Sequence, residues 1–186
     1  GVWATVVYFP VAAWVWGGGW IMGLGETLGF STSVIDYAGG TAVHINAGAA
    51  ALALALVLGK RIGFQKGINK PHSVPLVMLG ASILWFGWFG FNAGAEGTFN
   101  LLGTEDSTVG LIIVNTLGAT AAAIIGWLIV EKFKDGKATS VGAASGAVAG
   151  LVAITPACAS LTPGWALLLG LVTGVICAFA IELKWK

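Results

Sequence analysis

Residues 59–72 read GKRIGFQKGINKPH, and residues 73–95 continue as SVPLVMLGASILWFGWFGFNAGA. The first stretch carries four basic residues, whereas the second has no charged side chain. An apolar stretch of about 20 residues can cross the hydrocarbon core of a bilayer as a helix. A basic loop followed by such a stretch therefore predicts a membrane-spanning helix with a positively charged flank.

The composition of the whole chain indicates the same class. Of its 186 residues, 57% are apolar and 9% are charged, and the mean hydropathy is +0.90. These values lie far from those of soluble domains, so we expect an all-α integral membrane protein. The formal net charge of +1 leaves no basic face to neutralise phosphates, which argues against a nucleic-acid partner.

Apolar run length predicts five complete membrane-spanning helices and one truncated helix. The complete helices are expected near residues 41–58, 73–95, 108–131, 138–156 and 164–183. Residues 1–16 fit the end of a further span and lack the features of a signal peptide. Because the chain begins without Met and without a polar flank, we expect it to be a fragment.

The basic residues predict the topology. All nine fall within 60–70, 132–137 and 184–186, while most acidic residues fall in the alternate loops. Cytoplasmic loops of membrane proteins keep Lys and Arg. We therefore predict a multi-pass protein of the cell membrane, with loops 60–70 and 132–137 and the C-terminal end in the cytoplasm.

Many of the 29 glycines stand four residues apart, as in GxxxG motifs. The spaced sets are Gly142, Gly146 and Gly150, then Gly170 and Gly174, then Gly90 and Gly94. Small residues let helix backbones approach closely in lipid. The spacing predicts a tightly packed helix bundle.

His44 is the most informative polar residue within a predicted span, about one turn into its helix. Such groups are costly in a bilayer and usually face a pore or a partner helix. A neutral imidazole can donate with one nitrogen and accept with the other, which suits proton handling. A structural histidine bonded to a carbonyl is an equally weighted alternative.

Asp36 precedes the same helix. Its carboxylate is expected first to accept hydrogen bonds from the free amide groups of the helix start. The second interpretation is direct cation binding at a pore mouth, and both roles can coexist.

Aromatic residues crowd positions 85–91. Trp88 and Phe91 are three apart and share a helix face, so they would form a constriction or a cation–π cradle if that face lined a duct. Contact with lipid or with neighbouring helices is the alternative for most rings in such a run. Trp16, beside three glycines, is equally consistent with an interfacial anchor.

Four motifs, in order along the chain, resemble those of the ammonium transporter family, the Amt/Rh/Mep proteins. They are WGGG at 16–19, DYAGGT with HINA at 36–47, GWFGFNAG at 87–94, and SG through TPAC at 145–158. The first two resemble the Amt/Mep branch more than the Rh branch. The resemblance implies one incomplete transporter domain, covering roughly helices 4 to 9 of eleven. Residues 1–60 would end the first inverted repeat, and 61–186 would form part of the second.

The resemblance also implies a recruitment site for ammonium on the outer side. Trp16 matches its aromatic residue, and Asp36 matches the carboxylate that orders it. Family members commonly have Ser after Asn-Ala-Gly, where this chain has Ala95 followed by Glu96. Two alternatives are open: Ala95 weakens recruitment, or Glu96 takes over as a carboxylate.

The implied pore continues inward from this site. Phe91 matches a gate, Trp88 a pore-lining aromatic residue, and Leu84 a residue of the duct on its cytoplasmic side. His44 matches the first of two paired pore histidines, whose partner belongs to a later helix. His72 lies in the basic loop and is not expected to serve the pore.

These residues predict ammonium transport, with deprotonation near His44 and conduction of ammonia. An ammonium sensor or receptor on the same fold is the alternative. An enzyme is disfavoured because no nucleophile elbow or acid–base pair is evident. The spacing of Cys158 and Cys177 suits neither a metal motif nor a redox pair, so we expect no metal and no cofactor.

The expected partners are ammonium or ammonia and the lipid bilayer. By resemblance alone, we further expect a homotrimer and a PII-type signal protein on the cytoplasmic face.

Overall fold

The computed structural model describes residues 1–60, 62–64, 71–99, 107–181 and 183; the regular elements within them are helices, joined by turns and loops, and include no strand. Most of loop 60–70 and the end 184–186, whose cytoplasmic position the sequence predicts, lie outside the described residues. In chain order the helices are η1 Ala4–Tyr8, α1 Phe9–Trp16, α2 Leu24–Thr27, η2 Gly40–Ile45, α3 Asn46–Leu58, α4 Val74–Phe99, α5 Val109–Asp135, α6 Ser140–Ile154, η3 Thr155–Ala157 and α7 Pro163–Ala180.

Five of the described helical stretches are long and apolar enough to cross a membrane. They are Gly40–Leu58, Val74–Gly97, Val109–Asp135, Ser140–Ala157 and Pro163–Ala180. The five predicted spans are thus confirmed to within a few residues, although α7 ends at Ala180 rather than near 183. The apolar N-terminal residues form the shorter helix Ala4–Trp16.

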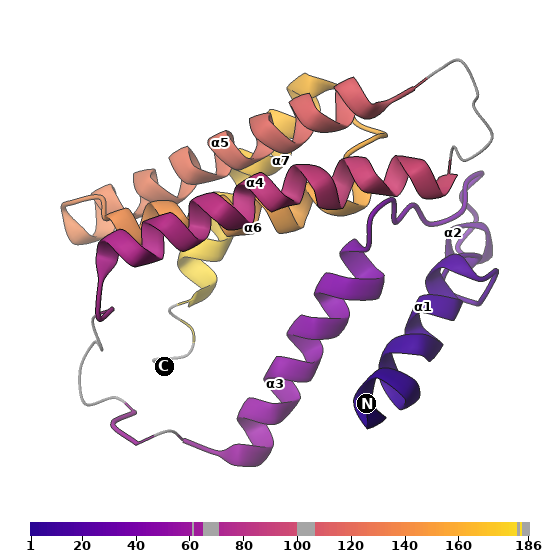
Figure 1. Ribbon diagram of the computed structural model, residues 1–186, viewed down its shortest axis with the longest axis horizontal. Helices are drawn as coiled ribbons and strands as arrows, with labels where there is room; N and C mark the ends of the chain where they lie inside the picture. The colour runs from indigo at the N-terminus through magenta and orange to yellow at the C-terminus, as the bar shows by residue number, and fades with distance from the viewer. Residues whose placement is uncertain (61, 65–70, 100–106, 182, 184–186) are drawn as a thin grey trace.

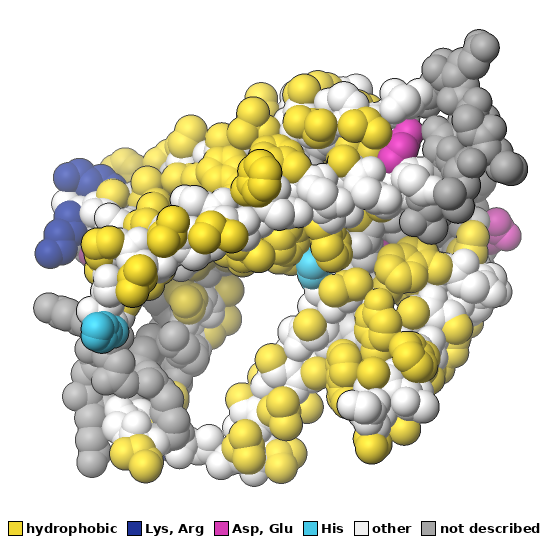
Figure 2. Space-filling view, viewed as in Figure 1, with side chains coloured by type: hydrophobic (Ala, Val, Ile, Leu, Met, Phe, Trp, Pro, Cys, Tyr) yellow, Lys and Arg dark blue, Asp and Glu magenta, His cyan; other side chains and the backbone are white. Residues whose placement is uncertain are grey.

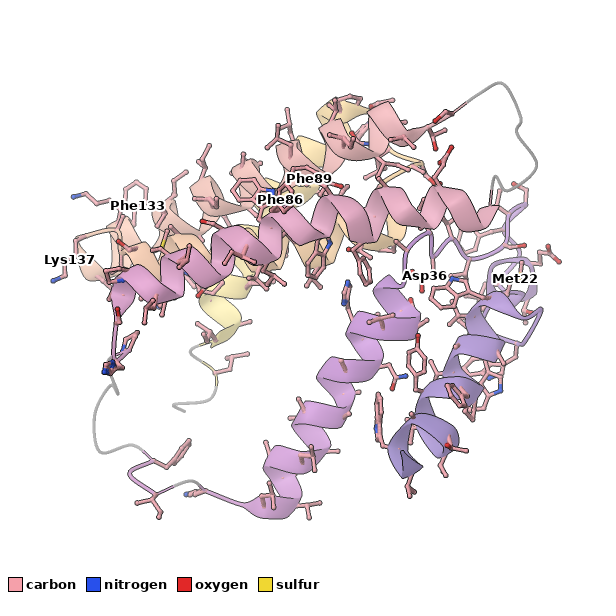
Figure 3. The ribbon with its side chains drawn as sticks, in the orientation of Figure 1. Met22, Asp36, Phe86, Phe89, Phe133 and Lys137 are labelled. Atoms are coloured by element: carbon pink, nitrogen blue, oxygen red, sulfur yellow. The ribbon has the colours of Figure 1, made fainter. Side chains whose placement is uncertain are left out.

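Helices α4 to α7 form a bundle in which α5 packs against α6 and α7, and α4 packs against α5 and α6 (Figure 1). Asp36 and Met22 lie at one end of the molecule, and Phe133 and Lys137 lie at the other (Figure 3). We call these the Asp36 end and the Lys137 end. The Lys and Arg side chains visible in Figure 2 gather at the Lys137 end.

Close helix packing depends on glycine, as the sequence predicts. A Cβ built on Gly170 would lie 2.0 Å from the carbonyl oxygen of Ala119, and one on Gly174 would lie 2.1 Å from that of Ala123. These contacts hold α7 directly against the backbone of α5. A Cβ on Gly150 would likewise lie 2.7 Å from the Ala123 side chain, so α6 also packs closely on α5.

The third glycine pair behaves differently. A Cβ on Gly90 or Gly94 would have no neighbour within 4 Å. Among the described residues nothing packs on this pair, and its packing role stays a prediction.

Helix α3 diverges from the bundle (Figure 1). Asn46 is its only buried residue, while Leu52, Leu54 and Leu56 are exposed. A helix that is apolar on all sides needs lipid or other helices around it. The preceding turn, η2, instead contacts α6, and this contact carries the candidate site.

Candidate functional site

Asp36 caps the start of the helix that carries His44. Its Oδ1 accepts hydrogen bonds from the amides of Gly39 (3.1 Å) and Gly40 (2.5 Å). Its Oδ2 accepts from the amides of Thr41 and Ala42, both at 2.9 Å. The first amides of a helix lack intrahelical partners, and the carboxylate, which is 6% exposed, satisfies four of them. The predicted cap is confirmed, while cation binding by Asp36 stays a prediction.

The variant Asp36→Asn is expected to lower the free energy of unfolding by roughly 1–2 kcal/mol, because an amide offers one acceptor oxygen where the carboxylate offers two. The thermal unfolding midpoint in detergent measures the change. Glu26→Gln, at an exposed position in α2, is the matched control and should leave the midpoint unchanged. Equal midpoints for Asp36→Asn and the wild type would contradict the capping role.

Two glycines allow the capped segment to approach the end of α6. Gly39 has a φ of +105°, a left-handed conformation that glycine adopts without strain. A Cβ on Gly40 would lie 2.6 Å from the ring of Pro156. The amide of Tyr37 donates to the Pro156 carbonyl oxygen at 2.9 Å. The segment from Asp36 to Gly40 is therefore fixed against η3.

Trp16, the last residue of α1, lies beside this segment. Its Nε1 donates to the backbone oxygen of Asp36 at 2.7 Å, and its side chain is 39% exposed. A Cβ on Gly39 would lie 3.4 Å from its ring. The structure thus brings together Trp16 and Asp36, the two residues that the family resemblance assigns to recruitment.

His44 stacks on two aromatic rings of α4. Its ring centroid lies 5.1 Å from that of Trp88 and 5.6 Å from that of Phe91, each at an interplanar angle of 26°. Trp88 and Phe91 lie 5.3 Å apart and share a helix face, as predicted. Trp88 is buried and Phe91 is 40% exposed. Phe86, in contrast, is 78% exposed and points away from the stack, as predicted for most rings in this run (Figure 3).

An open apolar groove of about 520 Å³ follows the stack along α4 toward the Lys137 end. Leu84 lines it together with Val77 of α4, and Val148 and Ser145 of α6 form its other wall. The Ser145 hydroxyl donates to the carbonyl oxygen of Val141 at 2.9 Å, so its hydrogen is already used within α6. The groove therefore offers little to bind a charge.

Thr155, to which sequence reasoning assigns no role, contacts the rings of both Trp88 and His44. Its Oγ1 accepts from Trp88 Nε1 at 2.9 Å, donates to the Leu151 carbonyl oxygen at 2.8 Å, and lies 3.3 Å from His44 Nε2. A hydroxyl has one hydrogen, so with that hydrogen on Leu151 it can only accept from His44. This network assigns the hydrogen of neutral His44 to Nε2 and leaves Nδ1 as an acceptor. The sequence signals for this role are a hydroxyl residue within an apolar span and its place in the TPAC motif of the family resemblance.

Ala95 and Glu96 lie at the Asp36 end of α4. Ala95 is partly buried and packs against the apolar cluster that includes Ala38 and Cys158. Glu96 is 7% exposed. Its carboxylate accepts hydrogen bonds from the Tyr37 hydroxyl (2.5 Å) and from both the amide and the hydroxyl of Thr108. Both of its oxygens thus bind protein groups.

His72 is exposed and stands just before α4, at the opposite end of that helix from the stack. The structure therefore does not bring it to His44.

Membrane-spanning helices that carry a histidine stacked on two aromatic rings, near an apolar groove, define a multi-pass membrane protein with a candidate solute path. The chain belongs to the Ammonium Transporter Family, whose family model matches residues 1–186. The family resemblance and the all-helical membrane fold inferred from the sequence are thereby confirmed.

Individual relatives support the same family. The chain is 54% identical, over 194 residues, to a protein of Mycobacterium tuberculosis named "Ammonium transporter", covering all of this chain and 38% of that protein. The crystal structure of Candida albicans Mep2 superposes with a TM-score of 0.83 at 41% identity, over 98% of this chain and 38% of that one. A structure named "Sensor Amt Protein" gives 0.81 at 34% identity, over 97% and 44%. The chain spans less than half the length of these relatives.

Proposed function

We propose that a protein carrying this chain conducts ammonia across a membrane after taking up ammonium. The observation that carries the proposal is the stack of His44 on Trp88 and Phe91, between the capped segment and the apolar groove. A ring that can accept a proton, stacked on the same helix face as an apolar groove, supports deprotonation before conduction.

Recruitment would occur beside Trp16, whose partly exposed ring can attract a cation. Asp36 would contribute mainly by ordering the segment and by its negative charge, since its oxygens already accept four amides. Ala95 offers no hydroxyl, so this step relies on the aromatic face and on the nearby carboxylates.

Ammonium would lose its water shell as it passes Phe91, and conduction of ammonia would follow. A cation is costly in an apolar path, whereas ammonia is neutral. Ammonium would lose a proton to Nδ1 of His44, the ring would release that proton before the next ammonium arrives, and ammonia would pass Trp88 and Leu84. Sodium has no proton to lose and keeps its full desolvation penalty, which gives selectivity without a tight cation site.

The Asp36 end would face outward and the Lys137 end the cytoplasm, because Lys132, Lys134 and Lys137 lie at the latter. Three further proposals rest on the family alone: a homotrimer, a PII-type partner on the cytoplasmic face, and an inverted-repeat junction near residue 60.

A sensor or receptor is the second candidate function, because the neighbour named "Sensor Amt Protein" shares the fold at 34% identity. Such a protein would use the same recruitment residues without sustained flux.

Uptake in cells that lack their own ammonium transporters tests the proposal. A chain of full family length that contains residues 1–186 should restore uptake at low ammonium, with sodium in excess failing to compete. Membrane-inserted protein without uptake would favour the receptor.

Thr155→Val is expected to lower the maximal transport rate by roughly 5- to 30-fold, because it leaves Trp88 Nε1 and His44 Nε2 without their acceptor at a cost of about 1–2 kcal/mol. Thr155→Ser keeps the hydroxyl and should stay within about twofold of the wild type. Initial rates in proteoliposomes measure both variants. Equal rates for the Val and Ser variants would exclude the positioning role of the hydroxyl.

A further inference from the structure

Two glutamate–threonine pairs on this chain use the same local chemistry. Glu96 of α4 accepts from the amide of Thr108 at 2.9 Å and from its hydroxyl, and Thr108 is the residue before α5. Glu131 of α5 accepts from the amide of Thr139 at 2.8 Å and from its hydroxyl at 3.0 Å, and Thr139 is the residue before α6. Each glutamate thus fixes the start of the following helix.

The third donor distinguishes the two pairs. Glu131 accepts from Trp127 Nε1 at 3.3 Å, one turn away on its own helix. Glu96 instead accepts from the hydroxyl of Tyr37, which is 59 residues away in the chain. Glu96 therefore joins α4 to the segment before η2, a link that capping of α5 does not need.

Tyr37 is held at two points. Its hydroxyl bonds to Glu96, and its amide bonds to the Pro156 carbonyl oxygen. Burial, and then the hydrogen bond to Glu96, raise the pKa of Tyr37 to about 12, so the hydroxyl stays a donor at physiological pH. The neighbouring residue is Asp36, whose backbone oxygen accepts from Trp16. A shift of Tyr37 would therefore move both recruitment residues.

We propose that Glu96 is a positioning residue for ammonium recruitment, which holds Tyr37 and thereby sets the placement of Asp36 and Trp16. The inference rests on the proposed function. It also gives a physical role to Glu96, the residue after Ala95, at the place where the sequence departs from the common family pattern. Because the carboxylate is buried and its oxygens accept from Tyr37 and Thr108, it acts through Tyr37 rather than by contact with the cation.

The test measures the initial rate of ammonium-driven transport against ammonium concentration, with a pH-sensitive dye inside proteoliposomes, using a chain of full family length that contains these residues. Tyr37→Phe removes one hydroxyl and should raise KM roughly five- to tenfold, with the maximal rate within about twofold of the wild type. Glu96→Gln should shift KM in the same direction.

Two control variants separate positioning from helix capping. Thr108→Ala removes a hydroxyl that bonds to Glu96 but leaves the Tyr37 contact, and Glu131→Gln disturbs the equivalent cap at the other end of α5. Both should lower the thermal unfolding midpoint and leave KM unchanged.

A wild-type KM in Tyr37→Phe would overturn the proposal, as would an equal rise of KM in Glu131→Gln. If the wild type shows no ammonium-dependent transport, the proposed transport fails, and calorimetric titration with ammonium chloride then decides the positioning role. A dissociation constant that rises in Tyr37→Phe but not in Thr108→Ala supports it, and equal constants refute it.

Discussion

Replacing His44 by alanine is expected to reduce ammonium-driven transport about tenfold or more, because the variant removes the proton acceptor at the mouth of an apolar path. Without it, the cation would have to enter the groove beside Leu84 with its charge, at a large desolvation cost. Ammonium jumps on proteoliposomes that contain a pH-sensitive dye measure the rate. The ring also stacks on Trp88 and Phe91, so the folded fraction of each variant is measured in parallel.

His72→Ala is the matched control, since it removes the same side chain from an exposed position outside the stack. Its rate should equal that of the wild type. A wild-type rate in His44→Ala, with selectivity over sodium retained, would contradict proton handling at this residue.

Gly170→Ala is expected to produce the largest loss of stability, about 3 kcal/mol in the free energy of unfolding. The new Cβ would lie 2.0 Å from the carbonyl oxygen of Ala119. Because this neighbour is backbone, α7 and α5 must separate to admit the methyl group. A lower thermal unfolding midpoint in detergent, and a lower yield of folded protein, report the effect.

Gly87→Ala supplies the control on α4, where a Cβ would meet no atom within 4 Å. It should keep or slightly raise the midpoint, because alanine favours helix over glycine. Similar losses in both variants would show that the close approach of α5 and α7 is not needed for stability.

Most of the fold could be predicted because it depends on local sequence. Long apolar runs predicted the five membrane-spanning helices, and glycine spacing predicted the close helix contacts at Gly170 and Gly174. Helix α4 continues past the predicted end at residue 95 because Glu96 finds hydrogen-bond donors there, so a charged residue does not end the helix. Spacing alone could not show whether a described helix packs on Gly90, because a GxxxG step identifies a small surface and not the helix that covers it.

The candidate site was predictable only where its contacts are local. The cap by Asp36 reaches amides three to six residues ahead, so its spacing was sufficient. Thr155 bonds to Trp88 across 67 positions and contacts His44 across 111, and Tyr37 bonds to Glu96 across 59. Sequence periodicity cannot reveal such pairs, because they form only when α4 and α6 pack beside η2 and the segment before it.

The most direct test measures flux and binding in one preparation of a chain of full family length that contains residues 1–186. Currents and ammonium-driven pH changes after an ammonium jump are recorded in proteoliposomes, and calorimetry measures ammonium binding in detergent. The proposed function predicts saturable, ammonium-dependent transport that sodium does not replace. Ammonium binding without current or uptake, in well-incorporated protein, would contradict transport and identify the site as a receptor.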